Sequence, residues 1–245
     1  MNNWITPNWP APSNIQAIFT TRIGGISKGP YESFNLGDHV GDTLASVNHN
    51  RAELFESLPS KPKWLNQMHG SRPIWVDKDI DCLQGDAALS KTKNIVCAIL
   101  TADCLPIFLC DEAGTVVGIA HAGWRGLIAG VIQKTVTEMR KECGHIIAYL
   151  GPAIGPKYFE IGEEVRCSFI KQDTISTSAF IPCNGTNKKK WLANIFLLAR
   201  QKLIKAGVTK IYSHEECTYS NSDKFFSYRR DGNTGRMAGL IWLTK

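Results

Sequence analysis

Three short polar segments interrupt apolar stretches of this chain, and each contains a side chain that can bind a metal ion. The segments with their candidate ligands are 66–70 with His69, 100–106 with Cys104 and 119–126 with His121. Two imidazoles and one thiolate form a zinc site with three protein ligands, which leaves a fourth position open for water. Zinc lowers the pKa of such a water to about 7 and so supplies hydroxide at neutral pH. Asp103 is a further catalytic candidate, because a carboxylate here could orient an imidazole or a substrate donor.

The same side chains also suit nucleophilic catalysis. Cys104 could attack as a thiolate, with His121 or His69 as its general base. Asp103 would then orient the histidine. The spacings, 35 residues from His69 to Cys104 and 17 from Cys104 to His121, do not show that the three side chains meet in space. The residues alone leave both interpretations open.

Arginines beside glycine-containing turns provide candidate anion sites. Arg125 lies at the start of a predicted helix, where free backbone N–H groups and the helix dipole also favour an anion. A guanidinium adds forked donors that suit phosphate or carboxylate. Arg229, in a turn with three arginines, and Arg22, just before two glycines, are the other candidates. The alternative for each loop is a surface turn whose arginine is solvated.

The elements that must position these residues are mostly strands. Apolar runs followed by turn signals predict strands at 15–20, 73–76, 95–101, 106–110, 116–119, 146–150, 208–212 and 237–243. Apolar periodicity predicts helices at about 46–58, 127–143 and 188–206, with Gly144 and Gly207 placed to close the last two. Residues 111–114 are predicted to form a hairpin turn between antiparallel strands.

Strands and helices do not alternate regularly, which disfavours a doubly wound parallel sheet. We therefore expect an α+β fold in which residues 1–245 form a single domain of layered mixed β-sheets flanked by helices. No Pro-, Gly- or Ser-rich linker divides the chain. The loosest segment, 172–190, is polar and ends in three lysines, and we expect it to be a solvated loop that leads into a helix.

Composition favours a globular protein that binds small anionic molecules. Hydrophobic residues make up 43% and charged residues 20% of the 245 residues, which excludes a disordered or coiled-coil chain. The net charge of +6 is low for a nucleic-acid binder, and no nucleic-acid motif is visible. The chain shows neither an export signal nor an apolar stretch that could span a bilayer. We therefore expect a cytoplasmic monomer that binds neither nucleic acid nor membranes.

Cysteine usage indicates a reducing compartment. The eight cysteines include no Cys-x-x-Cys pair, so we expect free thiols rather than disulfides. Most of them have apolar neighbours in the sequence and are predicted to be small core residues. Examples are Cys97, Cys110, Cys143 and Cys167.

Eight short motifs together resemble one bacterial family. They are TRxGG at 21–25, NLGDHVGD at 35–42, QMHG at 67–70, DAALS at 86–90, TADCLP at 101–106, HAGWRG at 121–126, GPAIG at 151–155 and SYRR at 227–230. They resemble those of the bacterial multicopper polyphenol oxidase or laccase-domain proteins, which are also described as purine nucleoside phosphorylases and as peptidoglycan editing factors. The resemblance runs over about residues 20–243, and HAGWRG combined with Ala-Asp-Cys is its most specific part.

The resemblance implies a zinc site at His69, Cys104 and His121, with Cu²⁺ as an alternative ion. It also implies a fold of layered helices and sheets akin to cysteine-hydrolase-like domains. The implied reactions are phosphorolysis of adenosine, inosine, guanosine and methylthioadenosine, and deamination of adenosine by water. Purine nucleosides and phosphate are then the small-molecule partners. The substrate-binding candidates are Arg22, Asn35, Gln67, Arg125 and Arg229.

Two other activities are considered for the same site. One is an amidase-type hydrolase that edits peptidoglycan precursors, with arginines holding the diphosphate of a nucleotide-linked muramyl peptide. The other, less favoured, is a copper polyphenol oxidase, because multicopper oxidases ligate their ions with more histidines than the six present here. Copper could still occupy a His/Cys site, since Cu(II) binds most such sites more tightly than zinc does.

Overall fold

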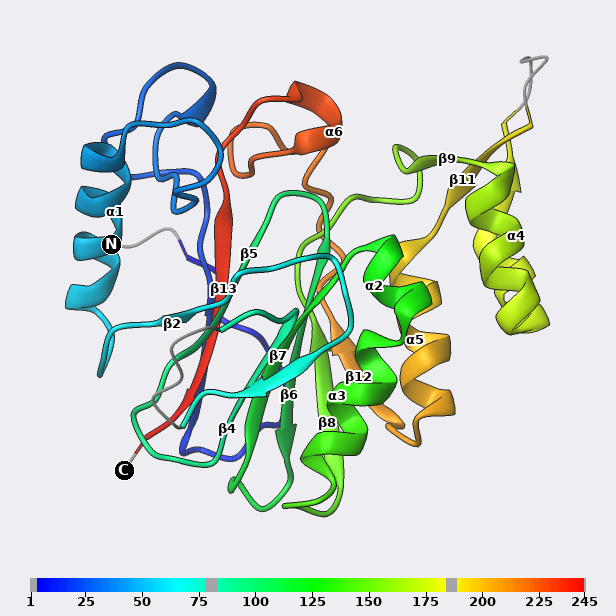
Figure 1. The fold of residues 1–245 in the computed structure, drawn as a ribbon, viewed down its shortest axis with the longest axis horizontal. Helices are drawn as coiled ribbons and strands as arrows, with labels where there is room; N and C mark the ends of the chain where they lie inside the picture. The colour runs from blue at the N-terminus through cyan, green and yellow to red at the C-terminus, as the bar shows by residue number, and fades with distance from the viewer. Residues whose placement is uncertain (1–3, 78–82, 184–188, 245) are drawn as a thin grey trace.

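The computed structural model describes residues 4–77, 83–183 and 189–244, and its centre is a six-stranded mixed sheet (Figure 1). The strand order is β12-β8-β6-β7-β4-β3. These strands are β3 (Pro73–Trp75), β4 (Ala87–Ser90), β6 (Leu105–Asp111), β7 (Val117–Ala122), β8 (Ile146–Leu150) and β12 (Lys210–Ser213). The four middle strands are antiparallel, whereas the edge strands β3 and β12 each pair parallel with their neighbour.

A four-stranded sheet of order β1-β13-β5-β2 packs against one face of the six-stranded sheet. Its strands are β1 (Ile15–Phe19), β2 (Lys63–Trp64), β5 (Cys97–Thr101) and β13 (Met237–Leu243). The interface between the two sheets is apolar, and the buried residues there include Phe19, Ile99, Phe108 and Ile119. Gly239 of β13 permits this close approach, because a Cβ there would lie 2.7 Å from Cδ1 of Ile119.

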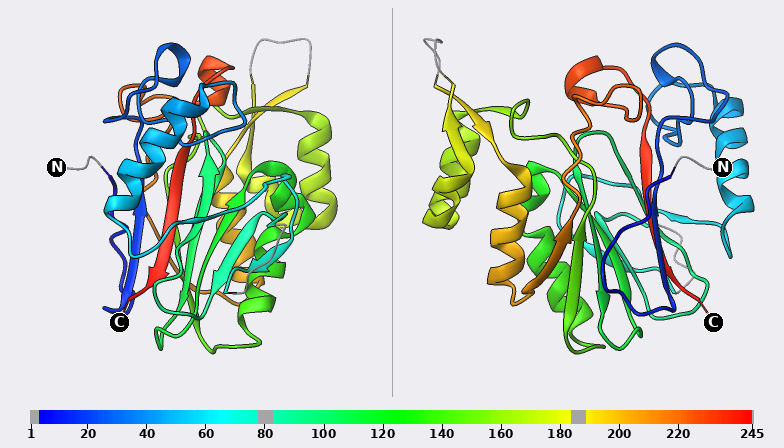
Figure 2. Two further views of the ribbon diagram at one scale, coloured as in Figure 1. Left: turned by 60° about the vertical axis from the view of Figure 1, so that its left-hand side comes forward. Right: turned by 180° about the vertical axis from the view of Figure 1, so that it is seen from behind.

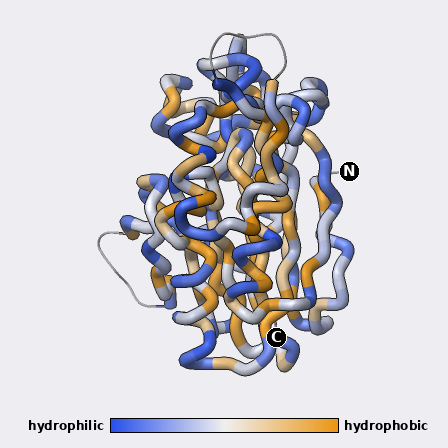
Figure 3. The backbone as a smooth tube through the Cα atoms, turned by 90° about the vertical axis from the view of Figure 1, so that its right-hand side faces the viewer, coloured by the Kyte–Doolittle hydropathy of each residue, from blue (hydrophilic) through white to orange (hydrophobic). Residues whose placement is uncertain are grey.

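Helices cover the outer faces of both sheets, which gives four layers (Figures 1 and 2). Helix α1 (Leu44–Glu56) lies over the four-stranded sheet, where Leu54 shares an apolar cluster with Leu240. Helices α2 (Trp124–Ala129), α3 (Val131–Met139) and α5 (Ile195–Lys205) cover the six-stranded sheet. In Figure 3, hydrophilic and hydrophobic residues alternate along the coils that face the viewer, as expected of helices with one face against a sheet.

A small sheet of order β10-β11-β9 extends from these layers together with helix α4 (Figure 2). Its elements are β9 (Glu160–Gly162), α4 (Glu163–Gln172), the 3₁₀ helix η2 (Thr174–Ala179), β10 (Phe180–Pro182) and β11 (Lys190–Ala193). Buried Phe169 and Phe180 attach this unit to the core cluster that also contains α5. The remaining short elements are the 3₁₀ helix η1 (Gly29–Tyr31) and helix α6 (Tyr228–Asp231).

The predicted α+β class is confirmed, as a fold with several mixed sheets and few helices. Each predicted strand occurs within a few residues of its expected position. The predicted hairpin turn joins β6 to β7, and Gly114 there adopts a φ of +69°. The carboxylate of Asp111 holds this turn by accepting hydrogen bonds from the backbone N–H groups of Thr115 and Val116, both at 2.7 Å. The kinship with cysteine-hydrolase-like domains and the single domain over 1–245 stay predictions.

The single helix predicted at 127–143 is wrong. The structure has two helices there, because Gly130 adopts a left-handed φ of +87° that ends α2 before α3 begins. Helix α3 ends at Met139, so Gly144 does not close it. Gly207, by contrast, has a φ of +78° directly after the end of α5. The apolar pattern of the sequence continues across Gly130 and therefore did not indicate that two separate helices meet there.

The helix predicted at 188–206 is also too long. Residue 188 lies outside the described residues, Lys190–Ala193 form strand β11, and α5 begins at Ile195. The side chain of Asn194 caps α5 by accepting a hydrogen bond from the backbone N–H of Leu197 at 3.0 Å. The expected solvated loop at 172–190 is likewise wrong in part, because it contains η2 and β10.

The described cysteines are all free thiols. Cys97 and Cys110 are buried as predicted, and Cys143 is partly buried. Cys167 is an exception, since it is exposed on α4 and its thiol contacts Oε1 of Glu163 at 3.2 Å. Within the described ranges, no helix combines the length and the apolar character needed to cross a bilayer.

Candidate metal centre

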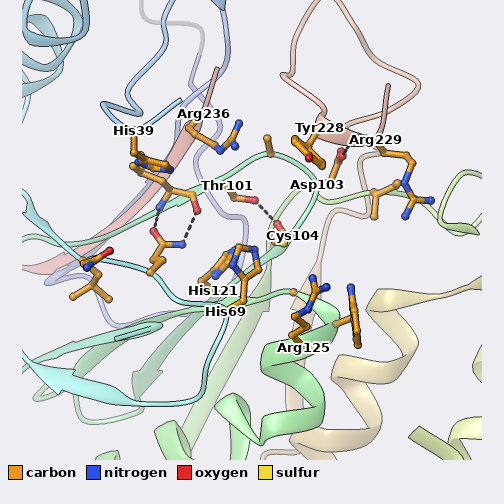
Figure 4. A pocket seen from close by; sticks show the side chains of 18 of the residues that line it. His39, His69, Thr101, Asp103, Cys104, His121, Arg125, Tyr228, Arg229 and Arg236 are labelled. Atoms are coloured by element: carbon orange, nitrogen blue, oxygen red, sulfur yellow. Dashed lines mark hydrogen bonds between the residues drawn. The ribbon is translucent and has the colours of Figure 1, made fainter. Parts of the chain in front are cut away.

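The side chains of His69, Cys104 and His121 come together at one end of the sheets (Figure 4). Their potential ligand atoms all lie within 4.8 Å of one another. Cys104 directly precedes β6 and His121 belongs to β7, and because Leu105 pairs with Ala122 in the antiparallel register, the two are neighbours. His69 comes from the loop between β2 and β3, and its ring meets that of His121 edge-on with the centroids 4.8 Å apart.

Asp86 fixes the geometry of both histidines. Its Oδ1 lies 3.0 Å from Nδ1 of His121, which directs the other ring nitrogen, Nε2, away from the carboxylate. Its Oδ2 accepts hydrogen bonds from the backbone N–H groups of Met68 at 3.2 Å and Gly70 at 2.7 Å, one on each side of His69. His69 itself has a φ of +54°, an unfavourable conformation for a non-glycine residue that these bonds hold in place. A single carboxylate that is 1% exposed thus ties the loop to the sheet.

The three side chains form a charged cluster. Burial alone would raise the pKa of the Cys104 thiol, but the charge of His121 and hydrogen bonds from both histidines outweigh it and lower this pKa to about 6. Burial likewise opposes protonation of His121, yet the Cys104 charge and the hydrogen bond to Asp86 raise the pKa of the imidazole to about 9. Burial alone would raise the pKa of Asp86, but the hydrogen bonds from His121, Gly70 and Met68 and the charge of His121 together lower this pKa below its usual range. Cys104 is therefore a thiolate at neutral pH.

The absence of a side chain at Gly123 leaves room for the thiolate of Cys104. A Cβ at Gly123 would lie only 2.8 Å from Sγ of Cys104, so a larger residue would displace the thiolate. On the other side, the hydroxyl of Thr101 donates a hydrogen bond to the carbonyl oxygen of Cys104. Asp103, in the same turn, adopts a φ of +89°.

The donor set fits a zinc ion. Two imidazole nitrogens and a thiolate are the ligand types that zinc prefers, and three protein ligands match its catalytic sites. A zinc ion would take the place of the His121 proton beside the thiolate, and Asp86 supplies the outer carboxylate partner that metal-bound histidines usually have. Among the described residues, this is the group of His, Cys, Asp or Glu side chains that could hold a metal. The identity of the ion stays a prediction.

A cavity of about 820 Å³ opens in front of the three side chains. Its walls combine aromatic and apolar side chains with a surplus of positive charge. The charged lining residues are Asp38, Arg51, Asp103, Arg125, Arg229 and Arg236. Such a cavity suits a small anionic or polar ligand.

Asp103 lines this cavity but does not orient an imidazole, as the sequence had suggested it could. Its Oδ1 accepts a hydrogen bond from the Thr218 hydroxyl at 2.6 Å, and its Oδ2 accepts one from the backbone N–H of Arg229 at 2.7 Å. Both oxygens are therefore engaged, Oδ1 with the segment that contains Thr218 and Oδ2 with α6. Asp86 performs the orienting role instead.

Three predicted substrate-binding residues line the cavity. The side-chain amide of Gln67 exchanges two hydrogen bonds with the backbone of Leu100, at 2.9 and 2.7 Å, which fixes the His69 loop to β5. Arg125 is exposed and lies over the Trp124 ring, with its Cζ 4.3 Å from the ring centroid. Arg229 is exposed, and its Nη1 donates to the backbone carbonyl of Glu160 at 2.7 Å.

Two predicted substrate-binding residues are not brought to the cavity wall. Arg22 donates hydrogen bonds to the backbone carbonyls of Glu32 and Ser222 and lies over the Phe226 ring, so its guanidinium is used to connect segments of the chain. Asn35 is fully buried, and its amide is engaged with Gly37 and Asp42. Neither side chain is therefore included in the function proposed below.

Sequence reasoning missed two residues of the site, Asp86 and Arg236. Asp86 opens the DAALS motif but gives no local signal, since only the fold brings its carboxylate to His121. Arg236 ends the glycine- and arginine-containing turn at 225–236 and lines the cavity as a partly buried side chain. The signal available for Arg236 was the third arginine of that turn.

The fold and the site together define a mixed α+β protein with a His/Cys/His group that could hold a metal ion at the end of two packed sheets. The chain belongs to the family described as multi-copper polyphenol oxidoreductase laccase, whose family model matches residues 16–244.

Similar proteins align with 99% of this chain. A protein of Escherichia coli (strain K12) named purine nucleoside phosphorylase YfiH is 48% identical over 253 residues, with 99% of this chain and 100% of the relative covered. Purine nucleoside phosphorylase PA4543 of Pseudomonas aeruginosa is 45% identical, with 99% of each chain covered. The crystal structure of Neisseria meningitidis protein NMB0706 superposes with a TM-score of 0.93 at 43% identity, covering 99% of this chain and 100% of the other.

Proposed function

We propose that this protein is a zinc-dependent purine nucleoside phosphorylase. The observation that carries the proposal is the convergence of His69, Cys104 and His121 at the wall of a cavity lined by arginines. The names of the two bacterial relatives described above support the same activity. A metal centre beside unpaired positive charge suits a reaction between a neutral nucleoside and phosphate.

The proposed reaction transfers the ribosyl group from the purine to phosphate. An oxygen of HPO₄²⁻ forms a bond to C1′ of the sugar while the bond between C1′ and N9 breaks. The proton of the phosphate goes to the departing purine, so the products are ribose 1-phosphate and the neutral base. Because the transition state gathers negative charge on the purine and holds an anion on the opposite side, positive groups in the cavity stabilise it.

His69, Cys104 and His121 would hold the zinc ion, which when bound supplies a Lewis acid to the cavity. Asp86 keeps the imidazole of His121 oriented through the bond to Nδ1. Asp103 holds the backbone of Arg229 and so keeps α6 against the metal turn. The exposed guanidinium of Arg125 contributes positive charge at the mouth of the cavity.

Adenosine, inosine, guanosine and methylthioadenosine are the proposed substrates. A cavity of about 820 Å³ with aromatic lining residues such as Trp64 and Phe159 has space for a purine and its sugar. We extend the proposal to deamination of adenosine, in which water adds at C6 of the purine and ammonia leaves, giving inosine. The names of the relatives do not favour the editing of peptidoglycan precursors.

A copper oxidase is not favoured by the ligand inventory. The described residues gather the ligands for a single metal ion at His69, Cys104 and His121, whereas a multicopper enzyme requires several such sets.

Chromatography of each nucleoside after incubation with zinc-loaded protein, with and without phosphate, tests the proposal. We expect free purine base only with phosphate, and inosine from adenosine in both conditions. Cys104→Ala should abolish both reactions and zinc binding, whereas Cys167→Ala, the same change at an exposed thiol, should alter neither. Absence of base release by the wild-type protein at any phosphate concentration would refute the phosphorylase proposal.

A further inference from the structure

The cavity holds a partly buried arginine, Arg236, with unused hydrogen-bond donors. Its Nη1 donates to the backbone carbonyls of Thr234 at 2.9 Å and Gly235 at 3.0 Å. Within the described ranges, its Nε and Nη2 form no hydrogen bond, and no carboxylate lies within ion-pair distance. Burial lowers the pKa of Arg236, and the negative charges of Cys104 and Asp103 oppose that lowering. A partly buried guanidinium with free donors that face a cavity is a strong binding group for an anion.

The other arginines of the cavity are differently placed. Arg51 forms an ion pair with Asp38, with Nη1 3.1 Å from Oδ2, and its charge is thereby compensated. Arg229 is exposed and is partly used by backbone carbonyl groups. Arg125 is exposed beside the Trp124 ring, where water competes for its donors. A guanidinium that is partly shielded from water and has no carboxylate partner binds phosphate more strongly than these exposed or paired groups do.

The backbone around Arg236 is built to place its side chain. Oδ1 of the buried Asn35 accepts hydrogen bonds from the backbone N–H groups of Gly37 and Arg236, both at 2.9 Å. The backbone N–H of Leu36 donates to the carbonyl of Arg236 at 3.1 Å. Gly37 leaves space for the arginine stem, because a Cβ there would lie 2.8 Å from Cγ of Arg236. The NLG segment at 35–37 therefore acts on the cavity through this arginine.

We propose that Arg236 binds inorganic phosphate in this cavity, with Asn35 and Gly37 as positioning residues. The assignment rests on the phosphorolysis proposed above and gives the phosphate its subsite. The Nε and Nη2 groups form a fork that matches two phosphate oxygens. In Figure 4, Arg236 lies on the same side of Cys104 as Thr101 and Tyr228, whereas Arg125 lies on the opposite side. Phosphate bound at Arg236 would lie on the Thr101 side of Cys104.

Titration calorimetry with inorganic phosphate and steady-state kinetics with inosine test the subsite together. In Arg236→Gln, the Kd and the KM for phosphate should rise by about 10- to 100-fold, the loss expected for hydrogen bonds to a charged group. The KM for inosine and the zinc content should remain close to those of the wild type. Arg236→Lys keeps the charge but removes the fork, so its affinity for phosphate should lie between the two. Arg125→Gln, which removes the same charge from an exposed position, should have the smaller effect on phosphate.

Gly37→Ala tests the positioning role without removing the arginine. The added methyl group displaces the stem of Arg236, so the KM for phosphate should rise while kcat at saturating phosphate changes less. Gly144→Ala is the matched control, because nothing lies within 4 Å of a Cβ there, and it should leave the KM unchanged.

Unchanged phosphate affinity in Arg236→Gln would overturn the subsite, as would an equal or larger loss in Arg125→Gln. Binding of adenosine 5′-monophosphate through Arg236 without binding of inorganic phosphate would also overturn it. The two proposals fail separately. Phosphate binding that depends on Arg236, in a protein that releases no purine base, would support the subsite and refute the phosphorylase activity.

Discussion

Replacement of Asp86 by asparagine should weaken zinc binding although Asp86 is not a ligand. Each oxygen of the carboxylate faces a donor: Oδ1 faces Nδ1 of His121, and Oδ2 faces the N–H groups of Met68 and Gly70. Asparagine has one oxygen and one NH₂ group. Whichever way the amide turns, its NH₂ group meets a donor.

The size of the effect follows from these contacts. Loss of an outer carboxylate partner typically weakens metal binding by about 10- to 100-fold, or about 1.4–2.8 kcal/mol. If the NH₂ group faces His121, it forces Nδ1 to accept, which moves the proton to Nε2 and blocks the nitrogen that faces Cys104. If the NH₂ group faces the loop, the two backbone donors beside His69 lose their acceptor. Either arrangement should also lower the free energy of unfolding of metal-free protein by about 1–3 kcal/mol.

Competition with a chromogenic chelator measures the zinc affinity, and urea unfolding of metal-free protein measures the stability. Asp77→Asn is the matched control, because Asp77 also accepts from a hydroxyl and a backbone N–H, those of Ser90 and Lys91, but has no contact with the metal centre. The control should lose stability without losing zinc affinity. Equal zinc affinity in Asp86→Asn and wild type would refute the argument that this carboxylate orients His121.

Further predictions concern the thiolate and the backbone. In metal-free protein, the rate of alkylation of Cys104 by iodoacetamide should rise through pH 6 and level off above it, because only the thiolate reacts. The exposed Cys167 should react only at higher pH, because the hydrogen bond to Glu163 raises the pKa of its thiol. Added zinc should protect Cys104 from the reagent, and a chelator should restore its labelling; labelling that ignores zinc would contradict the ligand assignment. Gly130→Ala should lower the free energy of unfolding, measured by urea titration, by about 1–2 kcal/mol, because alanine is strained at a φ of +87°. An unchanged or increased free energy of unfolding would contradict this reason.

Elements defined by local patterns could be predicted from the sequence. The β6-β7 hairpin is an example, since the apolar runs on either side of Asp111–Gly114 mark both strands. The break between α2 and α3 could not be predicted in the same way, because the apolar stripe continues across Gly130 and only the packing of two helix axes shows the change. Strand β11 was missed because its residues pair with β9 and β10, which are too short to give a pattern of their own.

The candidate metal ligands could be predicted from the sequence because histidine and cysteine are the side chain types that zinc prefers. Their partners were not, since a carboxylate or an arginine occurs in many roles. Asn35 shows the limit: its motif was noticed and its side chain was predicted to bind substrate, yet it is fully buried against the backbone of Arg236. Only the pairing of residues about 200 positions apart reveals that arrangement.

The position of β13 has a consequence for the order of events during synthesis. This strand follows all other strands in the sequence, yet it lies between β1 and β5 in the four-stranded sheet. On a translating ribosome, β1 and β5 therefore emerge with unpaired edges and an uncovered apolar face, and they stay so until residues 237–243 leave the exit tunnel. Arg236 arrives in the cavity at the same moment. A nascent chain thus contains His69, Cys104 and His121 early and Arg236 last, so the proposed binding of phosphate at Arg236 would report on chains whose four-stranded sheet is complete.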